Sequence, residues 1–400
     1  STTEIYTRLD SSAASDVYKR QALVGGIDRQ GGVRAVPEPD YIDWPEPEMD
    51  AVAAAGMQQE RVDQAGGSQY PHARYLLNRL PEAVNSSADS PLQVLFVSDA
   101  NPCYSLPNSK AFSDAFKKIP MVVSFSSYLG ETAELADFIL PSPIYLEQYE
   151  DRPIAAGYPL PIVNLTRPVV KPLFNTRSVG DVVIELARSL GGTVAAAFPW
   201  EDYQTCLKET LGDKWIVLNE KGYWAGDKLG SGGQPATFET KSSRFEFTNA
   251  EIDAMARFAP VEPEGDIAAF PLVLVPYDTM RLWNGYIGDP PFVIKIVPDT
   301  VLKNNDVLIE INPATASELG LQDGQAANLT TPRGTARVRV HLFEGIMPGV
   351  VALPAGLGHT AHSKFLAGKG ANVNALIGSV EDAATGYEAV WGIRAKLDKA

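Results

Sequence analysis

The chain has 400 residues, of which 45% are hydrophobic and 21% charged, and its formal net charge is −15. This length predicts two or three domains, and the composition is that of a folded globular protein rather than a disordered one. The negative charge argues against nonspecific nucleic-acid binding, because a polyanion would be repelled over most of the surface. No run approaches the roughly 20 apolar residues that cross a bilayer, so we expect no direct membrane insertion.

The cysteines and histidines do not predict a metal site. Cys103 and Cys206 lie far apart and no CxxC pair occurs, so two buried free thiols are favoured over a disulfide or a cluster site. His359 and His362 are three residues apart, but no flanking acid completes a ligand set. A Ser-His-Asp set and an acid–base pair in suitable context are also missing. We therefore predict neither metal ligands nor catalytic residues.

The N-terminal residues are not expected to belong to the fold. The sequence SSAASDVYKRQ at 11–21 resembles a translated adapter, so residues 1–21 are interpreted as a non-native scar and the chain as a fragment. An acidic, proline-rich stretch at 37–49, inside an insertion at 36–60, is expected to be exposed and to have little regular structure. Short helices are expected within 50–65 and 70–86.

The strongest pattern in the first half alternates short apolar runs with helical segments. The predicted elements are a strand at 93–99, a helix at 109–118, a strand at 120–127, a short helix at 130–137 and a strand at 138–141. This order with short links is typical of a parallel α/β unit. Ligands bind beyond the carboxyl ends of such strands, where the polar sequences DANP and SFSS lie. GxGxxG is absent, which disfavours classical NAD binding.

A further helix is predicted at 178–192, where SVGDVVIELARSLGG ends at a glycine pair. From Phe270 the pattern changes to short β-type segments separated by Gly, Pro, Asn and Asp turns, which predicts a compact barrel. The clearest hairpin lies at 330–339, and Asn312 is predicted to cap the helix that follows it.

Three segments resemble molybdopterin oxidoreductases of the dimethyl sulfoxide reductase superfamily. They are FVSDANPCYSLPNSKAF, VVSFSSYLGETAELADFILPSPIYLEQYED, and INPATASELGLQDGQAANLTTPRGTARVRVHLFEGIMPGVVALPAGLGH with the later NVNALIG and DAATG. The resemblance covers about residues 22–400 and rests on the joint order of the motifs. Within the superfamily it is greatest to polysulfide, thiosulfate and tetrathionate reductase catalytic subunits and to molybdopterin-like subunits of menaquinone reductases.

The resemblance implies an α/β fold class. A parallel-sheet Rossmann-like domain is expected at 22–265, with the insertion at 36–60, and a six-stranded β-barrel of the double-psi type at 266–400. It further implies two molybdopterin guanine dinucleotides with molybdenum or tungsten. The metal's protein ligand and a [4Fe-4S] cluster would lie in an N-terminal region outside this sequence, so we expect the fragment alone to be inactive.

Six polar residues of the α/β segment are candidate cofactor contacts, because they lie near strand ends or at a helix start. They are Asp99, Asn101, Ser124, Glu131, Thr132 and Asp137. Their oxygens and amides suit guanine, ribose and phosphate. Ordinary alternatives remain open: an Asx turn at Asp99 and Asn101, a helix-start charge at Glu131, and a turn residue at Asp137.

Six residues of the barrel segment are candidate contacts as well. They are Arg281, Trp283, Asn284, His359, Thr360 and Asn374. Arg281 offers a planar fork for phosphate, and His359 follows glycines that allow a close approach of the backbone to a flat ring. A surface arginine, a core tryptophan and a satisfied histidine are the alternatives.

Two functions follow from the resemblance. The favoured one is the cofactor-binding portion of a molybdenum oxidoreductase subunit in anaerobic respiratory electron transfer, acting on an inorganic sulfur compound or small oxyanion. Its expected partners are a ferredoxin-like iron–sulfur subunit and a membrane quinone-interacting subunit, and its expected location is the periplasm, with the cytoplasm as the alternative. The other function is a metal-free subunit that serves as a scaffold in a quinone-linked complex.

Overall fold

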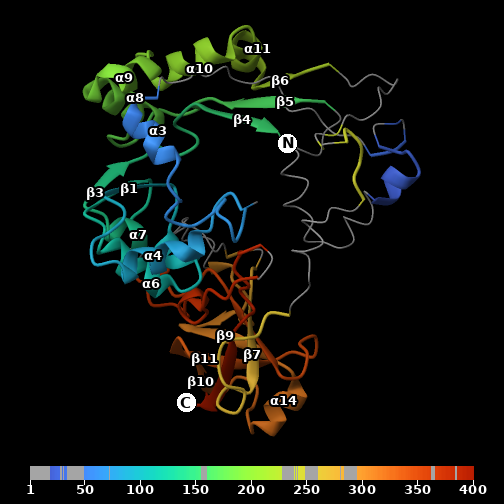
Figure 1. The fold of residues 1–400 in the computed structure, drawn as a ribbon. Helices are drawn as coiled ribbons and strands as arrows, with labels where there is room; N and C mark the ends of the chain where they lie inside the picture. Colours follow the sequence, from blue (N-terminus) through green and yellow to red (C-terminus); the bar gives the residue numbers. More distant parts are fainter. Residues whose placement is uncertain are drawn as a thin grey trace. The chain divides into compact units, whose positions relative to one another are not determined.

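A computed structural model describes most of the chain, which divides into two compact units (Figure 1). The described residues are 19–27, 29, 31–33, 49–71, 73–154, 160–227, 238, 240, 242–247, 260–279, 281–282, 295–361, 365–382 and 385–400. Unit 1 comprises Ser1–Gln58 and Ser142–Arg257, and unit 2 comprises Gln59–Pro141 and Phe258–Ala400. The domain boundaries expected from the sequence stay predictions.

Unit 2 contains a small parallel sheet made of the three strands that the sequence predicts. The strands are β1 (Val94–Ser98), β2 (Met121–Ser126) and β3 (Phe138–Pro141), in the order β1-β2-β3. The helices around them are η1 (Leu77–Arg79), α4 (Leu80–Ser86), α5 (Pro102–Ser105), α6 (Ser109–Phe116) and α7 (Glu131–Glu134). The parallel α/β prediction is thus confirmed.

Helices α4 and α6 pack on one face of this sheet. Val97 of β1 and Val122 of β2 form a buried cluster with Val84 of α4 and with Phe112 and Phe116 of α6. The apolar side chains of α6 recur at helical spacing, so they form one stripe that faces the sheet. The helices and this face of the sheet therefore share one hydrophobic core.

The second part of unit 2 is a closed ring of six strands. The elements are β7 (Leu272–Tyr277), β8 (Leu302–Lys303), β9 (Asp306–Ile311), α14 (Pro313–Glu318), β10 (Ala326–Thr331), β11 (Gly334–Leu342), β12 (Val350–Pro354), η2 (Val373–Ala375) and β13 (Arg394–Lys399). The ring runs β11-β10-β13-β7-β12-β9 and closes because β9 also pairs with β11. The β9–β11 and β7–β12 pairs are parallel. This confirms the predicted six-stranded barrel.

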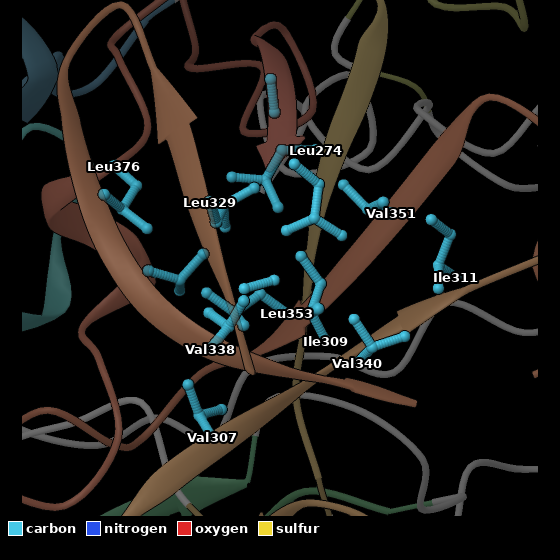
Figure 2. Packing of buried hydrophobic residues seen from close by; sticks show 14 of the residues in the cluster. Leu274, Val307, Ile309, Ile311, Leu329, Val338, Val340, Val351, Leu353 and Leu376 are labelled. Carbon is cyan, nitrogen blue, oxygen red and sulfur yellow. The ribbon is translucent and has the colours of Figure 1, made fainter. Parts of the chain in front are cut away.

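Alternating aliphatic side chains fill the barrel. Leu274, Ile309, Leu329, Val338 and Leu353 come from five strands and point into the common interior, where each is fully buried (Figure 2). Burying one such side chain contributes about 1.5–3 kcal/mol, so this interior supplies much of the stability of unit 2.

Local features of the barrel also agree with the sequence. Asn312 caps α14 by accepting a hydrogen bond from the N–H of Ala314. Strands β10 and β11 form the predicted hairpin, and Thr331 Oγ1 accepts hydrogen bonds from the N–H groups of Arg333 and Gly334 at the turn. These interactions are set by neighbouring residues, which is why the sequence reveals them.

Unit 1 combines an antiparallel sheet with helices. The strands are β4 (Glu150–Ile154), β5 (Ile162–Thr166) and β6 (Tyr223–Ala225), and the helices are α3 (Ala51–Met57), α8 (Val179–Leu190), α9 (Gly192–Ala197), α10 (Tyr203–Leu211) and α11 (Lys214–Lys221). As predicted, α8 stops at the glycine pair: its last residue is Leu190, and Gly191, which follows, has a positive φ of 73°. Cys206 in this unit and Cys103 in unit 2 are free and buried, in agreement with the sequence.

Candidate functional site

The loops after β1 and β2 meet at the carboxyl edge of the parallel sheet. Asn101 is the residue that joins them. Its Oδ1 accepts hydrogen bonds from the N–H (2.9 Å) and the hydroxyl (2.8 Å) of Thr132, and its Nδ2 donates to Glu131 Oε2 (2.7 Å). Thr132 Oγ1 in turn accepts from the N–H of Cys103 (3.1 Å). Both Asn101 and Thr132 are buried, so this network fixes the start of α7 against α5.

Glu131 connects this edge to a glycine-rich loop that follows β12 of the barrel. Its Oε1 lies 3.0 Å from His359 Nδ1 and accepts hydrogen bonds from the N–H groups of Thr360 (2.9 Å) and Ala361 (3.3 Å). Only 11% of the Glu131 side chain and 5% of the His359 side chain are exposed. One carboxylate therefore holds two segments of unit 2 that are far apart in the sequence.

Tyr104 contacts the glycine-rich loop at the same place, which we call the Glu131–His359 junction. Its ring stacks on His359 with a centroid distance of 3.7 Å and an interplanar angle of 15°. Its hydroxyl donates to the carbonyl of Leu357 (2.9 Å), while its own carbonyl accepts from Nδ2 of Asn372 (3.0 Å) and of Asn374 (2.9 Å). Burial raises the pKa of Tyr104 well above its ordinary value. The tyrosine thus stays neutral, and it forms hydrogen bonds with residues on both sides of His359, Leu357 before it and Asn372 and Asn374 after it.

A glycine is required beside this histidine. Gly358 has a φ of +78°, and a Cβ built there would lie 2.0 Å from the amide nitrogen of Asn372. Both the left-handed backbone and the lack of space exclude a side chain. The space beside Gly358 is thus occupied by the backbone of Asn372, and the expected approach of this segment to a flat ring stays a prediction.

The electrostatics of the junction keep Glu131 ionised. Burial by itself would raise the pKa of this carboxyl, but hydrogen bonds from His359 and Asn101 lower it to about 2. An anionic carboxylate facing Nδ1 selects the forms of His359 that carry a proton on Nδ1. Among the described residues Nε2 has no hydrogen-bond partner, so it is the ring atom left for a ligand.

The remaining candidate residues of the α/β part differ in exposure. Asp99 is exposed, and its left-handed backbone (φ 46°) turns the chain out of β1. Ser124 is buried within β2. Asp137 is exposed and accepts a hydrogen bond from the N–H of Val122 in β2 (2.7 Å). Ligand contacts by these residues stay predictions.

The candidate residues of the barrel segment also differ in exposure. Arg281 and Thr360 are exposed, whereas His359 and Asn374 are buried at the junction. Trp283 and Asn284 lie outside the described residues, as does His362. The sequence did not single out Tyr104, although it stands in the quoted NPCY motif; its role depends on partners more than 250 positions away, for which no local signal exists.

Two family models match the chain in the regions that meet at this junction. Residues 63–189 match the molybdopterin oxidoreductase family, and residues 295–390 match the molybdopterin dinucleotide binding domain. The chain thus carries a molybdopterin oxidoreductase region and a molybdopterin dinucleotide binding domain. The resemblance seen in the sequence is thereby confirmed, and the chain carries a domain of the type that binds a molybdopterin dinucleotide.

Proteins similar to this chain include several reductase subunits. It is 30% identical to the menaquinone reductase molybdopterin-binding-like subunit of Nitratidesulfovibrio vulgaris, over 92% of this chain and 48% of that protein. It is 24% identical to the arsenate respiratory reductase molybdopterin-containing subunit of a Shewanella species, over 94% and 54%. It is 22% identical to the thiosulfate reductase molybdopterin-containing subunit of Salmonella typhimurium, over 88% and 50%. The chain thus spans about half the length of these relatives.

A solved structure supports the same fold. Acetylene hydratase from Pelobacter acetylenicus is similar with a TM-score of 0.64 at 18% identity, over 86% of this chain and 50% of that one. Within the described part of the chain, no group of three or more His, Cys, Asp or Glu side chains is placed to hold a metal ion. The described helices also include none with the length and apolar character of a membrane span.

Proposed function

We propose that this chain is the cofactor-holding portion of a molybdenum or tungsten oxidoreductase subunit that binds two molybdopterin guanine dinucleotides. The observation that carries the proposal is the Glu131–His359 junction. It brings the carboxyl edge of the parallel sheet and the glycine-rich loop of the barrel together within one unit. Each of the two segments comes from one of the two matched family regions.

The residues at the junction fit such a cofactor. A pterin offers ring nitrogens and amino groups, and His359 Nε2 is a ring atom without a partner among the described residues. The exposed side chains of Arg281 and Thr360 would hold diphosphate and ribose oxygens. When bound, the cofactor supplies the redox metal; the chain's own residues bind it, orient it and keep the proton of His359 on Nδ1.

Three of the candidate residues are assigned a positioning role in place of direct cofactor contact: Asn101, Thr132 and Asn374. Their polar atoms form hydrogen bonds within the protein, to Glu131, to each other and to Tyr104. We therefore assign them to positioning of the loops that would face the cofactor. The predicted direct contacts by Asp99 and Arg281 remain compatible with the exposure of both side chains.

We further propose that the complete protein works in anaerobic respiratory electron transfer on an inorganic sulfur compound or a similar small oxyanion. The relatives named for arsenate and thiosulfate reduction support this class of substrate. A [4Fe-4S] cluster would lie in the part of the protein outside this chain. A ferredoxin-like subunit and a membrane quinone-interacting subunit would be the partners, and the periplasm the location.

A second function is favoured by one specific observation. The Nitratidesulfovibrio relative is named a molybdopterin-binding-like subunit of a menaquinone reductase. The alternative is therefore a metal-free subunit that serves as a scaffold in a quinone-linked complex.

Cofactor analysis of the complete protein tests both proposals. The protein is purified without oxygen, its pterin and guanine nucleotide are quantified after denaturation, and molybdenum and tungsten are measured by mass spectrometry. Two dinucleotides and one metal per protein are expected. Absence of the metal favours the scaffold function, and absence of pterin and nucleotide contradicts cofactor binding altogether. Arg281→Ala should lower the dinucleotide content, whereas Arg337→Ala, which removes an exposed arginine on β11, should not.

A further inference from the structure

Unit 1 contains a cluster of aromatic side chains that the proposed function does not use. The side chains are Tyr149, Trp200, Tyr203, Trp215 and Trp224. Tyr203 packs against two small cores of this unit, the one that β5 shares with α10 and α11 (Figure 1) and the one that α8 shares with α10. Three of the chain's six tryptophans therefore lie in cores that also contain Tyr203.

Tyr203 is held at its backbone, its ring and its hydroxyl. The hydroxyl donates a hydrogen bond to Asp151 Oδ1 at 2.8 Å, and the N–H donates to Asp181 Oδ1 at 2.8 Å. The ring lies against Gly180, where a Cβ would come within 2.5 Å of it. Asp151 of β4 is opposite Leu165 of β5, so both side chains point toward the helices. The phenol and the carboxylate are therefore a fixed donor–acceptor pair.

The protonation of Tyr203 decides which chemistry this pair can perform. Burial and the hydrogen bond to Asp151 raise the pKa of the phenol well above its ordinary value, so it stays protonated over the physiological range. A neutral phenol that loses an electron becomes a strong acid and must pass its proton to a base. Asp151 lies within hydrogen-bond distance for that transfer. The pair thus has the geometry in which a tyrosine loses an electron and a proton together.

The neighbouring aromatic rings supply a path for the electron. Indole and phenol rings are among the side chains that lose an electron most readily, and electron transfer between rings slows steeply with distance. The ring centroids of Trp215 and Tyr149 are 5.9 Å apart, which is direct aromatic contact. The ammonium of Lys214 lies over the ring of Trp224 at 5.3 Å. Because this positive charge disfavours a radical cation on Trp224, it favours electron loss from the other rings of the cluster.

We infer that Tyr203 and Asp151 form a redox-active pair that receives oxidising equivalents through the tryptophans of unit 1. A one-electron oxidant that reaches this unit removes an electron from an indole ring. Tyr203 returns an electron to that ring, its O–H bond breaks, and the proton forms a new O–H bond on Asp151 Oδ1. The products are a neutral tyrosyl radical, a protonated Asp151 and the oxidant reduced by one electron. A one-electron reductant such as a thiol reverses the step, and the proton returns to the phenol.

Cys206 is the side chain that competes with this pair for the oxidising equivalent. It is a free, buried thiol in the same core as Tyr203. Burial raises the pKa of the thiol to about 11, so it too keeps its proton and must lose it on oxidation. Tyr203 has the advantage, because its proton has a carboxylate acceptor at 2.8 Å. The pair thus acts as a sink for oxidising equivalents and spares the thiol from irreversible oxidation, and this role does not depend on cofactor binding.

Flash oxidation of the 400-residue chain tests the inference. A ruthenium polypyridyl complex, excited by a laser pulse in the presence of persulfate, is the one-electron oxidant. Transient absorption then separates indole radicals from tyrosyl radicals, because the two absorb at different wavelengths. Direct oxidation of exposed tyrosines speeds up with the concentration of the oxidant, whereas transfer within the protein does not. The phase that is independent of oxidant concentration, in which the indole signal falls as the tyrosyl signal rises, therefore reports on the cluster.

We expect Tyr203→Phe to abolish this phase and Asp151→Asn, which keeps the shape but not the base, to slow it at least tenfold. In the wild type it should be at least twofold slower in D₂O, a measurement that needs no variant. Tyr223→Phe is the matched control and should leave the phase unchanged, since Tyr223 is 51% exposed on β6 of the same unit. A phase that survives in Tyr203→Phe, keeps its rate in Asp151→Asn or shows no isotope effect would overturn the inference. Its loss in Cys206→Ser would also overturn it, in favour of the thiol.

Discussion

Replacing Glu131 with glutamine probes the junction between the parallel sheet and the barrel. The carboxylate accepts hydrogen bonds from His359, Thr360 and Ala361 on one oxygen and from Asn101 on the other. A glutamine has the same shape and keeps one acceptor oxygen. Its NH₂ group replaces the other oxygen, so a donor then faces the N–H donors of the junction. Hydrogen bonds to charged groups contribute about 1.5–3 kcal/mol each, and removing one partner of a buried pair costs about 3–5 kcal/mol. We expect Glu131→Gln to lower the free energy of unfolding of unit 2 by about 3 kcal/mol.

The pKa of Glu131 gives an independent estimate of the same order. It falls from an ordinary value of 4.5 to about 2, despite the opposing effect of burial, because of the hydrogen bonds from His359 and Asn101. That difference corresponds to about 3 kcal/mol. Because the pKa is lower in the folded state, this stabilisation is fully present above pH 4.5. It is lost as the pH falls from there through about 2.

The assay is urea unfolding of the wild type and the variant between pH 3 and pH 7. The wild type should lose more stability than Glu131→Gln as the pH falls below 4.5, so the difference between them should shrink. Glu318→Gln, an exposed change on α14 of the same unit, serves as the control and should follow the wild type. A variant within about 0.5 kcal/mol of the wild type at pH 7, or a difference that does not change with pH, would refute the reasoning.

Two further predictions concern the loop that carries His359. Gly358→Ala should destabilise unit 2 by more than 2 kcal/mol in urea unfolding, because its Cβ would lie 2.0 Å from a backbone atom. Gly349→Ala is the control: Gly349 has a similar φ of +79° but open space around it, so this change should cost only about 1 kcal/mol. Equal losses of stability in the two variants would contradict this argument. Tyr104→Phe should cost about 1 kcal/mol in the same assay, because the carbonyl of Leu357 loses its donor; unchanged stability would show that another donor replaces the hydroxyl.

The sequence predicted those parts of the fold that depend on neighbouring residues. Apolar runs located β1, β2 and β3, and turn residues located the β10–β11 hairpin. The Asn312 cap is also local, since its partner Ala314 is two residues away. Parallel order followed from the alternation of strands and helices, because the short helical connections return the chain in the same direction.

The site was harder to predict because its interactions join distant segments. Glu131 and His359 were both candidates, but nothing in the sequence indicates that they bind each other across 228 positions. Asn101 and Asn374 carry amide groups that suit a ligand, and in the fold those groups make hydrogen bonds within the protein. A residue type shows which hydrogen bonds are possible, and only the fold shows which partner is within reach.

The ring order of the barrel also has a consequence for biosynthesis. Strand β7, the first barrel strand to be made, is held between β12 and β13, and β13 also completes the edge of β10. While the chain emerges from the ribosome, one edge of β7 and one edge of β10 keep unpaired backbone N–H and C=O groups until residues 394–399 have been synthesised. Such edges pair readily with other chains, so the nascent barrel should be the stage most prone to aggregation and most dependent on chaperones.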